Sequence, residues 1–202
     1  MTQQHTVTTY TFNELNELSK ESARAWYREG SLGYDWSELV IDDAKTIGAL
    51  IGIDIGKVYF SGFSSQGDGA CFEGSYQYKK GSVKAVKDHA PENSELHKIA
   101  QTLADIQKPY FYDLVATISH QGRYYHAHCT IVDVDCKDHD ISRYCDFAFI
   151  AAHDAISEVL RDYMRWIYRS LESEHDYLMS DEQVDESITC NEYEFNQNGS
   201  IY

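Results

Sequence analysis

The part of the chain best suited to chemistry is a short polar loop between two runs of aromatic and small residues. The loop consists of Ser64, Ser65, Gln66, Gly67, Asp68 and Gly69. Backbone N–H groups in such a loop can cradle an anion, and a carboxylate there can serve as an acid, a base or a metal ligand. The alternative is a tight turn whose glycines supply positive φ. No Gly-Lys-Ser/Thr follows, which excludes a Walker loop.

Two further polar residues follow the loop at a spacing that puts them on one face of a strand. They are Cys71 and Glu73. A neighbouring carboxylate raises the pKa of a thiol and makes it a poor nucleophile, so a half-buried structural cysteine is the favoured interpretation of Cys71. We predict that the loop, Cys71 and Glu73 together form a binding site, without assigned catalytic residues.

A pair of histidines later in the chain raises the question of a metal. His126 and His128 share one face of a predicted strand, and Asp68, Glu73 or His120 would complete a ligand set if the two hairpins were adjacent. Histidines on a solvated strand face are more often packed against aromatic rings, so we predict no metal and no cofactor. The row of Cys, Asp and His over residues 129–140 matches no zinc or EF-hand spacing and is interpreted as a polar loop.

Two β-hairpins are expected to position these residues. The first has arms over residues 53–63 and 70–79, and the second arm alternates, with one face carrying Ala70, Phe72, Gly74, Tyr76 and Tyr78. The second hairpin is expected over residues 110–120 and 123–133, joined by Gln121 and Gly122. That turn would put one apolar row, Leu114, Ala116 and Ile118, opposite another, Tyr125, Ala127 and Cys129.

Helices are predicted before, between and after the hairpins. Helical spacing and capping residues predict one or two helices over residues 13–18 and 19–29. Further helices are predicted over residues 35–52, 82–89, 94–107 and 146–170, with a short one after Ser180. Short strands are expected over residues 7–12 and 192–195. The fold class is therefore α+β, a mostly antiparallel sheet of four to five strands packed against helices. We expect one domain over residues 1–202, with an acidic C-terminal segment over about residues 171–202.

The charge of the chain limits its partners. The formal net charge is −16, from 17 Lys and Arg against 33 Asp and Glu. After Arg169 there is no Lys or Arg, while nine acidic residues follow. Neutralising nucleic-acid phosphates needs clustered basic residues, so direct nucleic-acid binding is not expected. An acidic surface instead steers basic protein partners, and the 16 tyrosines suit a protein interface, although solubility and core packing also account for both features.

The composition also predicts where the protein works. No apolar stretch is long enough for a membrane span, and the polar start MTQQHTVTTY lacks the features of a signal peptide. Five cysteines without CxxC spacing fit reduced thiols, and they are Cys71, Cys129, Cys136, Cys145 and Cys190. A cytoplasmic protein is expected, which means the host cytoplasm if a phage encodes it.

Four segments together resemble a known family. They are TYTFNELNELSKESARAWYREG, VYFSGFSSQGDGACFEGSY, RYYHAHCTIVDV and NEYEFNQNGSIY. They are similar to bacteriophage proteins described as an antitoxin of a toxin-antitoxin stability system. The resemblance implies a phage accessory protein that blocks a host defence toxin, and it implies no catalytic residues.

Two functions are therefore expected as alternatives. The first is an antitoxin-like, anti-defence inhibitor that binds a host protein, namely a basic toxin or nucleic-acid-acting defence enzyme. The alternative is a small enzyme, metal-dependent or not, that hydrolyses a nucleotide signal or a modification with a site at the SSQGDGACFEG hairpin. The oligomeric state is not predicted.

Overall fold

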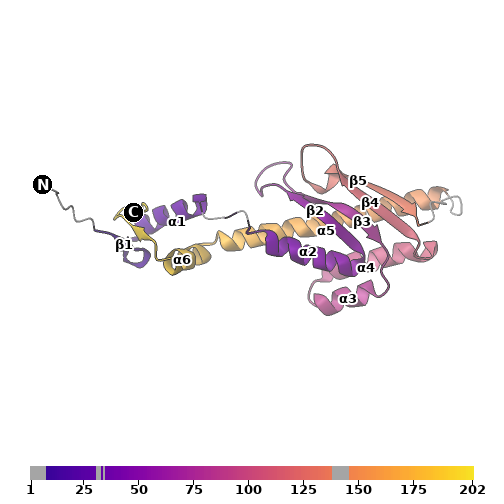
Figure 1. Ribbon diagram of the computed structural model, residues 1–202, viewed down its shortest axis with the longest axis horizontal. Coiled ribbons are helices and arrows are strands. Elements are labelled where there is room, and N and C mark those ends of the chain that lie inside the picture. Colours follow the sequence, from indigo (N-terminus) through magenta and orange to yellow (C-terminus); the bar gives the residue numbers. More distant parts are fainter. Residues whose placement is uncertain (1–7, 31–32, 34, 138–145) are drawn as a thin grey trace. The chain divides into compact units, whose positions relative to one another are not determined.

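The computed structural model describes residues 8–30, 33, 35–137 and 146–202, and these fall into two compact units (Figure 1). The smaller unit combines residues from both ends of the chain, 1–37 and 173–202, and the larger unit spans residues 38–172. The boundary lies within the long helix α5, Asp146–Leu178. The single domain expected over residues 1–202 stays a prediction.

The larger unit is built on a four-stranded antiparallel sheet. Its strands are β2 (Ile53–Phe60), β3 (Ala70–Gln77), β4 (Leu114–His120) and β5 (Thr130–Cys136), in the order β2-β3-β4-β5. The helices are α2 (Glu38–Ile51), α3 (Ser82–His89), α4 (Ser94–Gln107) and α5, with a 3-10 turn η2 at Lys108–Tyr110. The α+β class is confirmed, and so is the first hairpin, in which Phe60 pairs with Ala70.

One face of this sheet packs against helices and forms the core. Its buried side chains are Phe72, Tyr76, Leu114, Ala116, Ile118, Val132 and Val134. Helix α5 lies behind the sheet in Figure 1, and the ring of its buried Tyr163 contacts Phe72 with centroids 6.2 Å apart. The hydroxyl of Tyr163 donates a hydrogen bond to the carbonyl of Ala44 in α2. The opposite face carries exposed residues such as Thr117, Ser119 and Asp133.

The second hairpin is real, but its predicted register is wrong. Residues 121–129 form a long connection with a 3-10 turn, η3, at Ala127–Cys129, and β5 begins only at Thr130. Leu114 therefore pairs with Cys136, Ala116 with Val134 and Ile118 with Val132. Residues 130–136, which were partly interpreted as a polar loop, are the strand, because buried Val132 and Val134 alternate with exposed neighbours.

Most predicted helices are found, with changed ends. Helices α3 and α4 have the predicted bounds, and α2 begins later than expected. Of the one or two helices expected over residues 13–29, one is present, α1 (Glu17–Gly30), preceded by a 3-10 turn, η1 (Phe12–Glu14), and Asn16 accepts the N–H of Ser19 at the start of α1. Helix α5 continues to Leu178 rather than ending near Ser170. The residues 138–140 of the predicted polar loop, and Cys145, lie outside the described residues.

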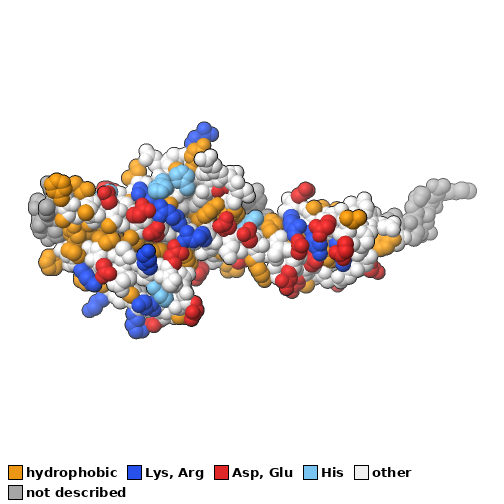
Figure 2. Space-filling view, turned by 180° about the vertical axis from the view of Figure 1, so that it is seen from behind, with side chains coloured by type: hydrophobic (Ala, Val, Ile, Leu, Met, Phe, Trp, Pro, Cys, Tyr) orange, Lys and Arg blue, Asp and Glu red, His pale blue; other side chains and the backbone are white. Residues whose placement is uncertain are grey.

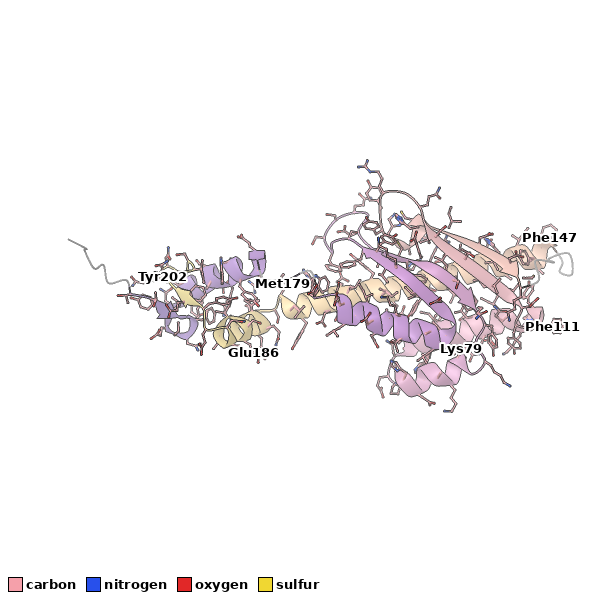
Figure 3. All side chains as sticks on the ribbon, in the orientation of Figure 1. Lys79, Phe111, Phe147, Met179, Glu186 and Tyr202 are labelled. Atoms are coloured by element: carbon pink, nitrogen blue, oxygen red, sulfur yellow. The ribbon has the colours of Figure 1, made fainter. Side chains whose placement is uncertain are left out.

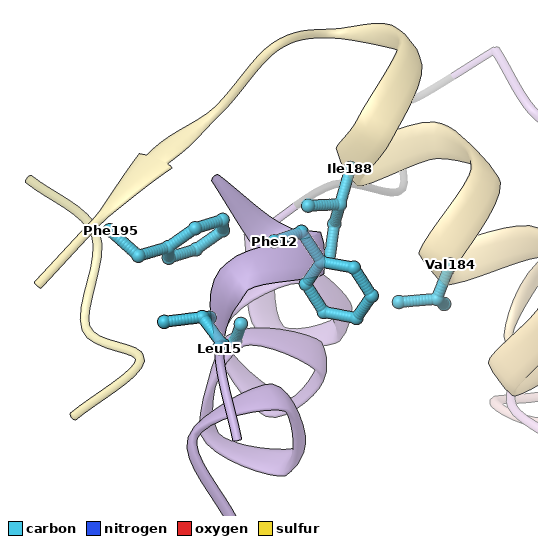
Figure 4. Packing of buried hydrophobic residues seen from close by; sticks show 6 residues of the cluster. Phe12, Leu15, Val184, Ile188 and Phe195 are labelled. Atoms are coloured by element: carbon cyan, nitrogen blue, oxygen red, sulfur yellow. The ribbon is translucent and has the colours of Figure 1, made fainter. Parts of the chain in front are cut away.

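The smaller unit has a core of its own. Helix α1, helix α6 (Asp181–Cys190) and the strand pair β1 (Tyr10–Thr11) and β6 (Glu194–Phe195) surround it. Figure 4 shows five of its buried side chains, which are Phe12, Leu15, Val184, Ile188 and Phe195. As predicted, Ser180 caps α6, and its hydroxyl accepts the N–H of Gln183 at 3.3 Å.

Two surface features complete the description. Phe111 and Phe147 are 84% and 86% exposed and lie at the same end of the larger unit in Figure 3. Among the described residues, no helix combines the length and the apolar character that crossing a bilayer requires.

Candidate functional site

The carboxylate of Asp68 organises the Gly-rich loop. Its Oδ2 accepts the backbone N–H of Ser64 at 3.1 Å and that of Ser65 at 2.6 Å. The bond from Ser65 contributes most to holding the pKa of Asp68 below its usual range. Ser61 closes the base of the loop, because its hydroxyl accepts the N–H of Gly69 at 3.2 Å. The charge of Asp68 is therefore directed at its own loop.

A turn that carries the two histidines packs directly against this loop. A Cβ atom on Gly69 would lie 2.5 Å from the Cα of His126, so only glycine permits this approach. His126 and His128 are not on a strand, which corrects the sequence prediction, because the chain turns into η3 at Ala127. The Gly-rich loop and the histidine turn nevertheless lie side by side, because Gly69 lets the two backbones approach closely at His126.

The hydrogen bonds of His126 assign its tautomer. Its Nδ1 accepts the N–H of His128 at 3.2 Å, so the proton of the neutral ring is on Nε2. This Nε2 lies 3.4 Å from the Sγ of Cys129. Because Nε2 already carries a proton, His126 cannot take one from the thiol, and the pair does not form a nucleophile with its base.

The two residues after the loop have structural roles. Cys71 is fully buried, and burial raises the pKa of its thiol to about 12. The carboxylate of Glu73 accepts the hydroxyl of Tyr59 at 2.9 Å and the N–H of His120 at 3.3 Å, which ties β2, β3 and β4 together. Neither Cys71 nor Glu73 is among the residues that line the pocket beside the loop, and the structural interpretation of Cys71 fits its buried position.

Helix α5 supplies two residues that the sequence analysis did not select. Arg165 forms ion pairs with Asp162 at 2.6 Å and Glu158 at 2.8 Å, and its NH2 group lies 3.4 Å from Nε2 of His128. The hydroxyl of Tyr168 donates to the carbonyl of Gly62 at 3.1 Å. A weak signal exists in the sequence, since Arg161, Arg165 and Arg169 recur at four-residue spacing and so share one helix face.

These segments line an open pocket of about 390 Å³ within the larger unit. Its lining comprises residues 66–70 of the loop, residues 126–128 of the turn, and Arg165 and Tyr168 of α5. Four of the predicted site residues, Gln66, Gly67, Asp68 and Gly69, line it, whereas Ser64 and Ser65 act through Asp68. In the part of the chain that the structure describes, no group of three His, Cys, Asp or Glu residues is placed to hold a metal ion.

What remains available in the pocket is a set of hydrogen-bond donors and ring faces. Arg165, His128 and the amide of Gln66 are donors, and the rings of His126 and Tyr168 are the faces. Such a set suits the binding of a small polar ligand more than acid–base chemistry, since Asp68 and His126 are both engaged by backbone N–H groups.

Comparison with known proteins adds a family but no activity. No curated protein and no solved structure matches the chain. The family described as "Domain of unknown function (DUF8835)" matches residues 36–181, which include the whole larger unit and extend nine residues beyond it, past the end of α5. Since this match covers more than half of the chain, the chain belongs to the DUF8835 family.

Proposed function

We propose that this chain is an antitoxin-like, anti-defence inhibitor of a phage, which binds a basic, nucleic-acid-acting host protein in the host cytoplasm. The observation that supports this most is the charge of the smaller unit. That unit contains 13 Asp and Glu residues against three Lys and Arg, a net charge of −10, whereas the larger unit has 20 against 14, a net charge of −6. The smaller unit thus carries most of the negative charge in about a third of the chain.

The three basic residues of the smaller unit are all paired inside it. Lys20 pairs with Glu17 at 3.2 Å, and Arg28 pairs with Asp181. Arg24 pairs with Glu21 and also with Asp185, whose two carboxylate oxygens it contacts at 2.6 and 2.7 Å. Since no Lys or Arg of this unit is left over, the remaining carboxylates present an uncompensated negative surface to a partner.

Several of these carboxylates are exposed to solvent, and they lie within a short stretch of the sequence. Glu182 and Glu186 lie on α6, and Glu194 lies on β6. Exposed charges of one sign accelerate encounter with an oppositely charged surface and repel nucleic acid and anionic membrane. The resemblance to phage antitoxins and the electrostatics support the same kind of partner, a basic protein.

Capture from host extract with two matched variants tests the proposal. Glu182→Gln, Glu186→Gln and Glu194→Gln together remove three charges from the smaller unit. Asp54→Asn, Glu92→Gln and Asp133→Asn remove three exposed charges from the larger unit. We expect the wild type and the second variant to retain one basic host protein, which salt releases, and the first variant to lose it. Equal retention by both variants, or retention of an acidic protein, would contradict the proposal.

A small hydrolase at the hairpin is the second candidate, and the pocket is the observation in its favour. Its weakness is the lack of a suitable base, because Asp68 and His126 are held by backbone N–H groups and Cys71 is buried. An assay of phosphate release from nucleotides tests it. Turnover that is lost in Asp68→Asn would favour the hydrolase over the inhibitor.

A further inference from the structure

We infer that the pocket between the Gly-rich loop, the histidine turn and α5 binds a phosphate monoester that carries a planar ring, a ligand of the nucleotide class. This site is separate from the acidic surface of the smaller unit and does not depend on the proposed protein partner. Its volume of about 390 Å³ lies in the range of small-molecule pockets.

Arg165 is the group that fits a phosphate. Asp162 and Glu158 fix the position of its guanidinium, and His128 accepts a third contact. These contacts use three of the five N–H groups, and the other two have no hydrogen-bond partner among the described residues. A guanidinium held in this way can donate one of these remaining N–H groups to a phosphate oxygen at little entropic cost.

His128 adds a second donor next to this guanidinium. Arginine only donates, so Nε2 of His128 accepts from Arg165 and the proton of the ring is on Nδ1. Among the residues that the structure describes, Asp68 is the one acidic residue that lines the pocket, and its Oδ2 accepts two backbone N–H groups of its own loop, which partly offset its negative charge. The donors of the pocket thus outweigh its one lining acid.

Two rings supply faces for a planar group. Tyr168 is held by its hydrogen bond to Gly62 and by the ring of Phe63, whose centroid lies 5.4 Å away. His126 is held by the N–H of His128 and by the nearly parallel ring of Tyr124. Rings that are fixed in this way can stack on a nucleobase, which contributes about 1–3 kcal/mol per base in proteins that bind single strands.

The local charge favours an anion although the whole chain is acidic. Figure 2 shows histidine side chains beside a run of Lys and Arg side chains on the larger unit, with Asp and Glu among them. In the sequence of α5, Arg161, Arg165 and Arg169 recur at four-residue spacing, which places them along one face of the helix. Because Glu158, Asp162 and Glu95 pair with these arginines, the described surface around the pocket has no surplus of positive charge that would hold a long polyanion. A single nucleotide therefore fits better than a nucleic-acid strand.

Calorimetric titration of the full chain with AMP tests the inference, with adenosine and inorganic phosphate as partial ligands. The variants are Arg165→Gln, His128→Gln and the control Arg169→Gln. Arg169 lies one turn further along the same face and also pairs with a carboxylate, but it does not line the pocket. Circular dichroism verifies the fold of each variant, and exposed His128 provides a variant that keeps the test valid if Arg165→Gln fails to fold.

We expect AMP to bind more tightly than either partial ligand. Arg165→Gln should weaken AMP binding by about tenfold or more, as expected for the loss of a charged hydrogen bond, and His128→Gln should weaken it less. Arg169→Gln should leave it unchanged. The inference is overturned if AMP does not bind the folded wild type, if adenosine or phosphate binds as tightly as AMP, if an RNA strand binds more tightly, or if Arg165→Gln and Arg169→Gln behave alike.

Discussion

Gly69 and His126 lie so close together that a Cβ atom on the glycine would be 2.5 Å from Cα and 2.7 Å from Cβ of the histidine. Gly69 is the first residue before β3, and His126 directly precedes η3, so this contact joins two connections that are far apart in the sequence. It is the reason that the Gly-rich loop and the histidine turn share one pocket.

Replacement of Gly69 by alanine should force these connections apart. Cβ atoms do not approach backbone this closely, so we expect the free energy of unfolding to fall by about 1–3 kcal/mol. Gly62→Ala is the control, because a Cβ atom there would meet its nearest neighbour, Asp68 Oδ2, at an ordinary 3.5 Å, and the expected change is below about 0.5 kcal/mol. Urea unfolding measures both. Equal effects of the two variants would show that the contact is not tight.

Asp68 should make the stability of the loop depend on pH. Its folded-state pKa is lowered, so its contribution is full at a pH above the unfolded-state value and is lost as the pH falls through the folded-state value. Asp68→Asn imitates the protonated form. The difference in unfolding free energy between wild type and this variant should therefore be largest near neutral pH and should disappear in strong acid. A difference that does not change with pH would refute the assignment.

The bond between Arg24 and Asp185 should be the strongest ion pair of the smaller unit. Arg24 is mostly buried, and its contact with both oxygens of Asp185 raises the pKa of the guanidinium. Asp185→Asn should destabilise the unit by about 1–3 kcal/mol, against about 0–1 kcal/mol for Asp181→Asn, whose partner Arg28 is more exposed. Hydrogen exchange of the α1 and α6 amides measures both, and a reversed order would contradict the prediction.

The described cysteines should differ in reactivity. Only the thiolate is alkylated, and Cys71 is fully buried with a raised pKa, whereas Cys190 is exposed. Iodoacetamide at mildly alkaline pH should modify Cys190 rapidly and Cys71 only when the protein unfolds. Peptide mass spectrometry follows each site. Modification of Cys71 at the rate of Cys190 would show that β3 is accessible in the folded chain.

Local signals in the sequence predict several elements whose ends are set by a capping residue, a proline or a Gly-rich turn. Helix α4 has the predicted bounds because Asn93 accepts the N–H of Leu96 at its start and Pro109 follows its end. The first hairpin is predicted because a Gly-rich polar loop separates two runs of aromatic and small residues, the second of which alternates, and Phe60 pairs with Ala70 as expected. These signals are short-range, so they are visible in the sequence without knowledge of the fold.

The second hairpin shows where such signals are insufficient. Gly122 has φ +98°, as a turn would require, but seven more residues, 123–129, follow before the ladder between the strands begins at Thr130. The β propensity of Tyr124 and Tyr125 favoured a strand at these residues. The strand that forms, β5, contains Asp133 and Asp135, whose low β propensity favoured a loop there. The pocket was predicted only from its loop, since nothing local reveals that Arg165 and Tyr168 of α5 lie beside it.

The salt dependence of association tests the central claim most directly. Once the captured host protein is purified, its association rate with the full chain is measured over a range of ionic strength. Electrostatic steering by the acidic smaller unit predicts a rate that falls by about tenfold or more from low to physiological salt, and a much weaker dependence for the variant with Glu182→Gln, Glu186→Gln and Glu194→Gln. A rate that is independent of salt, or equally dependent in both proteins, would contradict the proposal that this surface captures a basic partner.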